Sequence, residues 1–233
     1  SEAPFIVYGD ERLSFAETYA AAARVAHVLV TDYNIERGDR VAISMRNYPE
    51  WILSFMAVTA VGGIAVAMNA LWRPDEMAFG LSDSGAKLLI ADQERLDRFA
   101  DIDPVLNIQV IAVRPDASIH PNLADLVKAH ADVSEMPEQK PQPEDDATLM
   151  YTSGSTGNPK GVASCHINIV SALMSWELDQ TTAIALLPEA PAEPEHPPAT
   201  LLAVPLFHAT GSHAVFLASY RHQRKLVAMY KWN

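Results

Sequence analysis

A short segment rich in hydroxyl groups and glycine carries the residues of this sequence best suited to binding phosphate. It covers residues 151–162 and reads Tyr-Thr-Ser-Gly-Ser-Thr-Gly-Asn-Pro-Lys-Gly-Val. Glycines let a backbone approach an anion, hydroxyl and amide groups donate hydrogen bonds to its oxygens, and a lysine adds a positive charge. Segments of similar composition also serve as flexible linkers, so the neighbouring sequence has to decide between the two.

The position of this segment in the chain favours phosphate binding over a linker. The segment begins at the end of an apolar, strand-like run at 148–152 and precedes a predicted helix at 166–180. Open α/β sheets bind ligands at the carboxyl ends of their strands, where this segment would lie. A kinase-type P-loop requires a glycine before its lysine and a hydroxyl residue after it. Here Pro159 precedes Lys160 and Gly161 follows it, so the segment is not a Walker loop.

Short apolar runs alternate with helix-length segments along most of the chain. Continuous apolar strands separated by helices indicate a parallel sheet that is covered on both faces. The sequence therefore predicts a doubly wound α/β fold with mostly parallel sheets flanked by helices. The expected strands are 41–45, 64–68, 88–92, 108–113, 148–152, 201–207 and 225–230, and the expected helices are about 14–32, 49–61, 75–83, 166–180 and 211–220, with a further short helix after 88–92.

The first residues predict a β-hairpin followed by a helix. Residues 5–15 fit two short strands that turn at Gly9-Asp10. Ser14 and Glu17 have the spacing of a capping box, in which each side chain accepts a hydrogen bond from the other residue's backbone. An alanine-rich helix is expected to begin there.

The composition predicts a protein with a large core and an acidic surface. Of its 233 residues, 49% are hydrophobic, and its formal net charge is −12. Because phosphate backbones are bound mainly through an excess of Lys and Arg, this charge argues against a nucleic-acid partner. Cys165 is the only cysteine, which excludes an intramolecular disulfide and a thiolate metal site. We expect a soluble cytoplasmic protein that binds small molecules, and the sequence specifies no oligomeric state.

One uncharged run, residues 51–71, is long enough to cross a bilayer. Gly62-Gly63 interrupts this run where a helix would end. The interruption predicts two buried elements of an α/β domain in place of a transmembrane segment.

Two stretches interrupt the alternation of strands and helices. Both are acidic and proline-rich, and this composition is typical of connectors on the surface. They are 135–147 and 188–198. The first is expected to divide the chain into a first α/β portion at 1–134 and a second portion at 148–233 that contains the phosphate loop.

The ten residues at 152–161, Thr-Ser-Gly-Ser-Thr-Gly-Asn-Pro-Lys-Gly, closely resemble the signature loop of the adenylate-forming superfamily. That superfamily comprises acyl-CoA synthetases, the adenylation domains of peptide synthetases, and firefly-type luciferases. Three further stretches resemble it: GDRVAI at 38–43, DSGAK at 83–87 and VPLFHATG at 204–211. The likeness extends over almost the whole chain. It implies that residues 1–233 form the first, incomplete part of the large N-terminal domain of an AMP-dependent synthetase and ligase.

The resemblance implies a two-step reaction. A carboxylate attacks the α-phosphate of Mg²⁺-bound ATP to give an acyl-adenylate and pyrophosphate, and a thiol, usually that of coenzyme A, then displaces AMP. In this family the signature loop binds the β- and γ-phosphates, and the first hydroxyl of the loop, Thr152, is also expected near the Mg²⁺ ion. The implied phosphate-binding residues are Thr152, Ser153, Gly154, Ser155, Thr156, Gly157 and Lys160.

The resemblance also implies an acyl-binding region around His208. In acyl- and aryl-CoA synthetases the matching position holds histidine or an aromatic residue beside the carboxylate that is activated. Amino-acid-activating domains have a Phe-Asp pair there, whereas this chain has Phe207-His208. A plain carboxylic acid, fatty or bulky and apolar, is therefore the expected substrate. Thr210 and Gly211 are expected to shape the same wall of the pocket.

Several nearby residues have less specific interpretations. His213 and Phe216 lie one helical turn apart, so they fit the acyl pocket and the core equally well. Cys165 and His166 are expected to pack or cap the following helix. The charged residues Asp83, Lys87, Arg37, Asp39 and Arg40 are expected to support turns of the fold.

No catalytic residue is assigned within 1–233. The resemblance places the adenylation lysine, the ribose-binding aspartate and the mobile C-terminal domain of such enzymes beyond Asn233. We therefore expect the isolated 233-residue chain to be inactive as a synthetase. Two alternatives stay open: a piece of an amino-acid adenylation domain in a carrier-protein assembly line, and a non-enzymatic nucleotide-binding protein that retains the loop.

Overall fold

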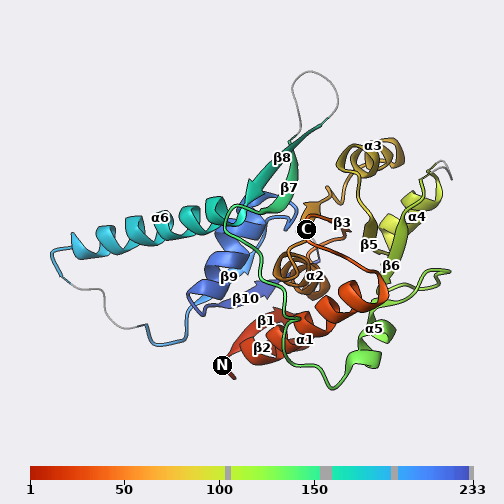
Figure 1. The fold of residues 1–233 in the computed structure, drawn as a ribbon. Coiled ribbons are helices and arrows are strands. Elements are labelled where there is room, and N and C mark those ends of the chain that lie inside the picture. The colour runs from red at the N-terminus through yellow and green to blue at the C-terminus, as the bar shows by residue number, and fades with distance from the viewer. Residues whose placement is uncertain (103–105, 153–158, 190–193, 231–233) are drawn as a thin grey trace.

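The computed structural model describes residues 1–102, 106–152, 159–189 and 194–230, which form two sheets with helices packed on them (Figure 1). The larger sheet has six strands in the order β6-β5-β3-β4-β7-β8, and the smaller has four in the order β2-β1-β10-β9. The larger is made of β6 (Gln109–Val113), β5 (Leu88–Asp92), β3 (Arg40–Ser44), β4 (Ile64–Ala67), β7 (Asp146–Thr152) and β8 (Lys160–Cys165), and the smaller of β2 (Glu11–Ser14), β1 (Pro4–Tyr8), β10 (Lys225–Ala228) and β9 (Ala199–Leu202).

The strand directions confirm the mostly parallel architecture. In the larger sheet only β8 runs antiparallel to its neighbour β7. In the smaller sheet β1, β10 and β9 are parallel, and β2 forms the predicted antiparallel hairpin with β1. The hairpin turn contains Gly9 in the left-handed conformation, at φ 54°.

The helices also follow the predicted alternation. Helix α1 begins at the expected capping box, in which the Glu17 amide donates to Ser14 Oγ at 3.1 Å and the Ser14 amide donates to Glu17 Oε2 at 2.7 Å. The helices are α1 (Phe15–His27, extended by a π-helical turn at Val28–Asp32), α2 (Pro49–Ala60), α3 (Pro74–Ser84), α4 (Gln93–Ala100), α5 (Leu123–Leu126, extended by a 3₁₀ turn at Val127–His130), α6 (His166–Ala185), and α7 (Ala218–Arg221, preceded by a π-helical segment at Thr210–Leu217).

The six-stranded sheet is covered on both faces, as the doubly wound prediction requires. Successive residues of a strand point to opposite faces of the sheet. In β3, Val41 and Ile43 contribute to a core with α1, α2 and the smaller sheet. Ala42, between them, belongs to a second core with side chains of α3 and α4. The predicted division of residues 51–71 is also confirmed, since α2 ends before Gly62 and β4 follows.

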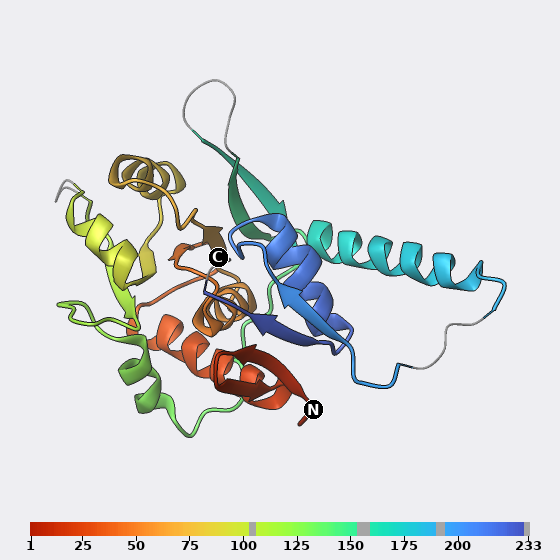
Figure 2. The ribbon, with the colours of Figure 1, turned by 180° about the vertical axis from the view of Figure 1, so that it is seen from behind.

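Within the described ranges, no helix combines the length and the apolar character that a bilayer crossing needs. The longest, α6, starts beside β8 and projects away from both sheets, as the front and back views show (Figures 1 and 2).

The strand predicted at 201–207 is confirmed only at residues 201 and 202 and is wrong for 203–207. Strand β9 ends at Leu202, and the chain then leaves the sheet. The Asn47 side chain explains this departure, because it forms two hydrogen bonds with the backbone of the segment after Leu202, in place of those that a neighbouring strand would form. Its Nδ2 donates to the Val204 carbonyl at 3.0 Å, and its Oδ1 accepts from the Leu206 amide at 2.9 Å. The segment that leads to His208 is thus fixed from the end of β3.

Candidate functional site

A pocket of about 600 Å³ lies at the carboxyl ends of β4 and β7. This edge of a parallel sheet is where open α/β folds bind ligands. The pocket unites two regions that the sequence singled out separately, the start of the glycine-rich segment and the segment that carries His208. Its lining residues are Ala67, Asn69, Leu71, Trp72, Glu76, Met150, Tyr151, Thr152, Pro159, Phe207, His208 and Ala209.

The described ends of the glycine-rich segment form the last pair of a β-ladder. Thr152 and Lys160 are direct partners in the register of β7 and β8. Thr152 Oγ1 donates to the Lys160 carbonyl at 3.4 Å, and both residues are exposed. Of the predicted phosphate-binding residues, Ser153, Gly154, Ser155, Thr156 and Gly157 lie outside the described residues.

Tyr151, just before Thr152, is held on the side of the pocket formed by α3. Its hydroxyl donates to the Asp83 carboxylate at 2.7 Å, and its ring meets the Trp72 ring edge to face with centroids 5.3 Å apart. Burial, reinforced by the hydrogen bond to Asp83, raises the pKa of Tyr151. Gly80 leaves room for the indole, because a Cβ there would lie 2.5 Å from Trp72 Cζ3. Asp83 therefore has a supporting role, as the sequence predicted.

His208 reaches the pocket from a tightly bonded turn. Its amide donates to the Pro205 carbonyl at 3.2 Å, and its own carbonyl accepts from the Ser212 amide at 2.9 Å and from Ser212 Oγ at 3.0 Å. The preceding Phe207 is buried, whereas His208 is exposed. The backbone of His208 is thus fixed while its imidazole remains accessible from the pocket.

Thr210 and Gly211 do not line this pocket. Gly211 is buried, and a Cβ on it would lie 2.1 Å from the Pro205 carbonyl oxygen. A close approach between two backbone segments therefore accounts for glycine at this position. Thr210 is exposed at the start of the π-helical segment.

The alternative between pocket and core for His213 and Phe216 is resolved in favour of the core. Phe216 is fully buried between Phe5 and Phe55. His213 packs edge to face on Phe55, and its Nδ1 lies 2.9 Å from Ser212 Oγ. Burial lowers the pKa of His213, so the neutral imidazole is favoured.

Other predicted support residues lie away from the pocket. Lys87 Nζ donates to the Asn34 carbonyl at 2.6 Å and to Asp39 Oδ2 at 2.7 Å, which ties two turns together as expected. Cys165 precedes α6 and is half-buried, with its Sγ 2.8 Å from Asn168 Oδ1. His166 is half-buried, and burial lowers its pKa. Among the described residues, no group of three or more His, Cys, Asp or Glu side chains could hold a metal ion.

Six residues of the pocket lie outside the motifs that the sequence singled out, and two of them, Ala67 and Met150, belong to predicted strands. Asn69, Leu71, Trp72 and Glu76 lie in or just after the connection that follows β4. They form no motif and have no periodic pattern. Their position after the carboxyl end of a buried parallel strand was the only signal that could have identified them.

Comparison with known proteins identifies the family. The sequence model described as AMP-binding enzyme matches residues 1–233. Oxalate–CoA ligase from Arabidopsis thaliana is 32% identical over 218 residues, which cover 91% of this chain and 39% of that protein. Long-chain-fatty-acid–CoA ligase FadD13 from Mycobacterium tuberculosis is 30% identical over 219 residues, with the same two coverages. The chain thus spans about two fifths of the length of these curated relatives.

Solved structures agree with this result. The inhibitor-bound N-terminal domain of FACL13 from Mycobacterium tuberculosis superposes with a TM-score of 0.82 at 27% identity, covering 99% of this chain and 54% of that one. O-succinylbenzoate coenzyme A synthetase from Bacillus subtilis, in complex with AMP, gives a TM-score of 0.74 at 28% identity, covering 100% of this chain and 53% of that one. Together, the family match, the similar folds and the matching loop show that this chain belongs to the AMP-binding, adenylate-forming family of acyl-CoA synthetases and related ligases.

Proposed function

We propose that the protein containing this chain activates a carboxylic acid with ATP to an acyl-adenylate and then forms a thioester with coenzyme A. One observation carries the proposal. Thr152, at the start of the signature loop, and His208, in the acyl motif, line a single pocket at the carboxyl edge of the larger sheet. A phosphate-binding loop and a site for a carboxylate must lie side by side for this reaction.

The pocket residues have distinct roles in this proposal. Negative charge shifts onto the pyrophosphate leaving group when a carboxylate attacks the α-phosphate, and fixed donors near it lower the barrier. The loop at 152–160 supplies hydroxyl and amide donors, and Lys160 adds a positive charge. Mg²⁺, bound together with ATP, neutralises phosphate charge, and the exposed Thr152 hydroxyl is an oxygen ligand of the type it prefers. Mg²⁺ commonly binds to substrate phosphates with few protein ligands, so the lack of a carboxylate cluster among the described residues is compatible with its binding.

The acid substrate is proposed to lie against His208, with its apolar part along the apolar lining residues Ala67, Leu71, Met150 and Phe207. The names of the relatives include ligases for oxalate, long-chain fatty acids, 2-succinylbenzoate and 4-coumarate, so the family accepts varied acids. The apolar lining favours a fatty or bulky apolar acid for this protein. Phe207-His208 supplies no carboxylate to pair with the ammonium of an amino acid, which disfavours an amino-acid adenylation domain.

The adenylation lysine is proposed to lie in the remainder of a longer protein. The cytoplasm is the proposed location of that protein. The 233-residue chain alone is accordingly expected not to catalyse the reaction.

A substrate panel with hydroxylamine trapping tests the function. The whole protein is incubated with ATP, Mg²⁺, hydroxylamine and one acid at a time: dodecanoate, benzoate, oxalate or an amino acid. With an apolar acid we expect ATP-dependent formation of hydroxamate and pyrophosphate. When coenzyme A replaces hydroxylamine, we expect acyl-CoA and AMP as the products. Hydroxamate with amino acids alone would favour the adenylation-domain alternative. ATP binding without hydroxamate from any acid would favour the non-enzymatic one.

A further inference from the structure

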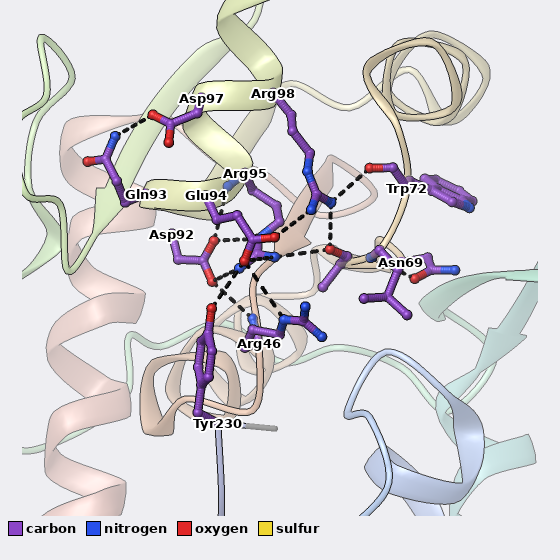
Figure 3. Close-up of polar contacts among 12 residues, drawn as sticks. Arg46, Asn69, Trp72, Asp92, Gln93, Glu94, Arg95, Asp97, Arg98 and Tyr230 are labelled. Atoms are coloured by element: carbon purple, nitrogen blue, oxygen red, sulfur yellow. Dashed lines mark hydrogen bonds and ion pairs between the residues drawn. The ribbon is translucent and has the colours of Figure 1, made fainter. Parts of the chain in front are cut away.

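A buried ion pair lies at the carboxyl end of β5 (Figure 3). Asp92 and Arg95 are 3% and 1% exposed, and Arg95 Nη2 donates to Asp92 Oδ2 at 2.6 Å. The same carboxylate caps α4 by accepting from the Arg95 amide at 3.2 Å, and it accepts from the Arg46 amide at 3.1 Å. Burying two charges is costly, and apolar residues of similar volume often give equal stability. Stability alone therefore does not account for this ion pair.

Both arginines of α4 reach the connection between β4 and α3. Arg95 Nη1 donates to the Ala70 carbonyl at 3.1 Å. Arg98 Nη1 donates to the same carbonyl at 2.9 Å and to the Trp72 carbonyl at 2.9 Å. Figure 3 shows the two guanidinium groups converging on this connection from α4. The backbone of residues 70–72 is thus held by three hydrogen bonds from one helix.

The side chains of the same connection form one wall of the pocket. Asn69, Leu71 and Trp72 line the pocket, whereas the held carbonyls of Ala70 and Trp72 face α4. The Trp72 ring contacts Tyr151, the residue before Thr152. An uninterrupted series of contacts therefore links the buried ion pair to the start of the signature loop.

Arginine is well suited to this arrangement. A guanidinium group has five N–H donors in a fixed plane, so it can bind a carboxylate and a carbonyl at once. Arg95 uses Nη2 for Asp92 and Nη1 for Ala70. Glu94 extends the network, with its Oε2 2.9 Å from Arg95 Nη1 and accepting from the Tyr230 hydroxyl at 3.1 Å. Tyr230 follows β10, so the network also joins the smaller sheet.

We propose that Arg95 and Arg98 are positioning residues, which hold the carbonyls of Ala70 and Trp72 and thereby fix the pocket wall formed by Asn69, Leu71 and Trp72. The identification of this wall as part of a substrate pocket rests on the proposed function. The anchoring of the connection by α4 does not.

Arg98→Met is the main test variant. It keeps the aliphatic stem and removes both hydrogen bonds of Arg98 to the connection, while the Asp92–Arg95 pair stays intact. The Leu71 and Trp72 amides are themselves hydrogen-bonded, to Asn69 Oδ1 and to the Asn69 carbonyl, so their hydrogen exchange reports opening of the connection. We expect roughly tenfold faster exchange in a peptide covering 69–72, with exchange in α1 unchanged.

Kinetics on the whole protein give the second measurement. Misplacement of a substrate-contacting wall by a fraction of an ångström is expected to raise KM for the acid roughly tenfold, with a smaller change in kcat. Arg98→Lys separates geometry from charge. It keeps the positive charge near Glu94, but its shorter side chain is not expected to bring Nζ to the two carbonyls that Arg98 Nη1 holds, so its KM and its exchange rate should resemble those of Arg98→Met.

Two further variants complete the design. Asp92→Asn combined with Arg95→Met neutralises the pair while retaining an acceptor for the α4 amide, and it is expected to accelerate exchange at 69–72 as well. Arg221→Met is the matched control, because it removes an arginine–carboxylate contact, to Glu177, between α7 and α6. It should alter neither measurement.

The outcomes are separable. Unchanged exchange at 69–72 in Arg98→Met would overturn the proposal, and so would accelerated exchange with an unchanged KM for the acid. A wild-type exchange rate and a wild-type KM in Arg98→Lys would overturn it as well. Accelerated exchange in a protein whose wild type forms no acyl-adenylate would uphold the anchoring of the connection and defeat the proposed function.

Discussion

Thr152 and Lys160 lie directly opposite each other on the last rung of the β7–β8 ladder, and the Thr152 hydroxyl donates to the Lys160 carbonyl at 3.4 Å. Residues opposite each other in an antiparallel pair project their side chains from the same face of the sheet. The ladder therefore places one hydroxyl and one cation on a common face, at the two ends of the glycine-rich segment. This is a suitable base for a loop that binds the phosphates of ATP.

Replacement of Lys160 tests this arrangement. In the whole protein, Lys160→Ala is expected to slow ATP-dependent adenylation about 10- to 100-fold, because a fixed charge near the leaving pyrophosphate is lost. The measurement is pyrophosphate release at varied ATP concentrations. Lys128→Ala, which removes an exposed lysine paired with Asp125 in a distant turn, is the control. Identical ATP kinetics in Lys160→Ala would exclude Lys160 from the site.

His208 is expected to act on the acid and not on ATP. His208→Ala should raise KM for the acid roughly tenfold and change KM for ATP little, whereas His208→Phe should retain part of the affinity through its ring. Initial rates at varied acid and at varied ATP separate the two effects. The control is His196→Ala, at an exposed position. An equal rise in both KM values would argue against direct contact with the acid.

Gly211 is expected to be a structural requirement. In Gly211→Ala the added Cβ would lie 2.1 Å from the Pro205 carbonyl oxygen, so one backbone segment must move. Overpacking of this kind costs about 1–3 kcal/mol of the free energy of unfolding. Thermal unfolding measures the loss, with Gly161→Ala as the comparison, because there the Cβ meets the movable Leu149 side chain at 3.0 Å. Equal melting temperatures for the two variants would contradict the prediction.

Asn47 is expected to hold the segment before His208 in place. Asn47→Ala removes partners from the Val204 carbonyl and from the buried Leu206 amide, and a buried group left unpaired costs about 1–3 kcal/mol. Chemical denaturation measures the change, with the exposed Asn107→Ala as control. A stability equal to that of the control would show that the segment keeps its path without Asn47.

The buried His213 should make stability depend on pH. Its pKa is lowered by burial from the ordinary value of 6.5, so the unfolded chain binds more protons than the folded chain once the pH falls toward 6.5. The free energy of unfolding is therefore expected to decrease as the pH falls from about 7.5 to 5, and to recover as it rises. His166, whose pKa burial also lowers, contributes in the same direction.

Substitution of His213 tests its share of this dependence. His213→Gln keeps a polar partner for Ser212 Oγ and is expected to give a shallower slope of unfolding free energy against pH. Denaturant unfolding at several pH values provides the measurement. His196→Gln, at an exposed position, should leave the slope unchanged. A wild-type slope in His213→Gln would show that His213 does not cause the dependence.

Local signals in the sequence determined most of the elements and the family of this protein. The capping box of Ser14 and Glu17, the turn at Gly9 and the buried strands of the larger sheet all depend on residues that are close in the chain. The signature loop was recognisable from residues 152–161 alone, because phosphate binding requires glycines, hydroxyl groups and a lysine within one short stretch.

The tertiary structure alone decided where these elements meet. Strand β8 has no apolar pattern, since it pairs only with β7 at the sheet edge and is largely exposed. The end of β9 depends on Asn47, far away in the sequence. The order of strands in the sheets places Thr152 and His208 on the same pocket and brings Arg95 within hydrogen-bonding distance of the Ala70 carbonyl. Periodicity reports which face of an element is buried but not which distant segment covers it.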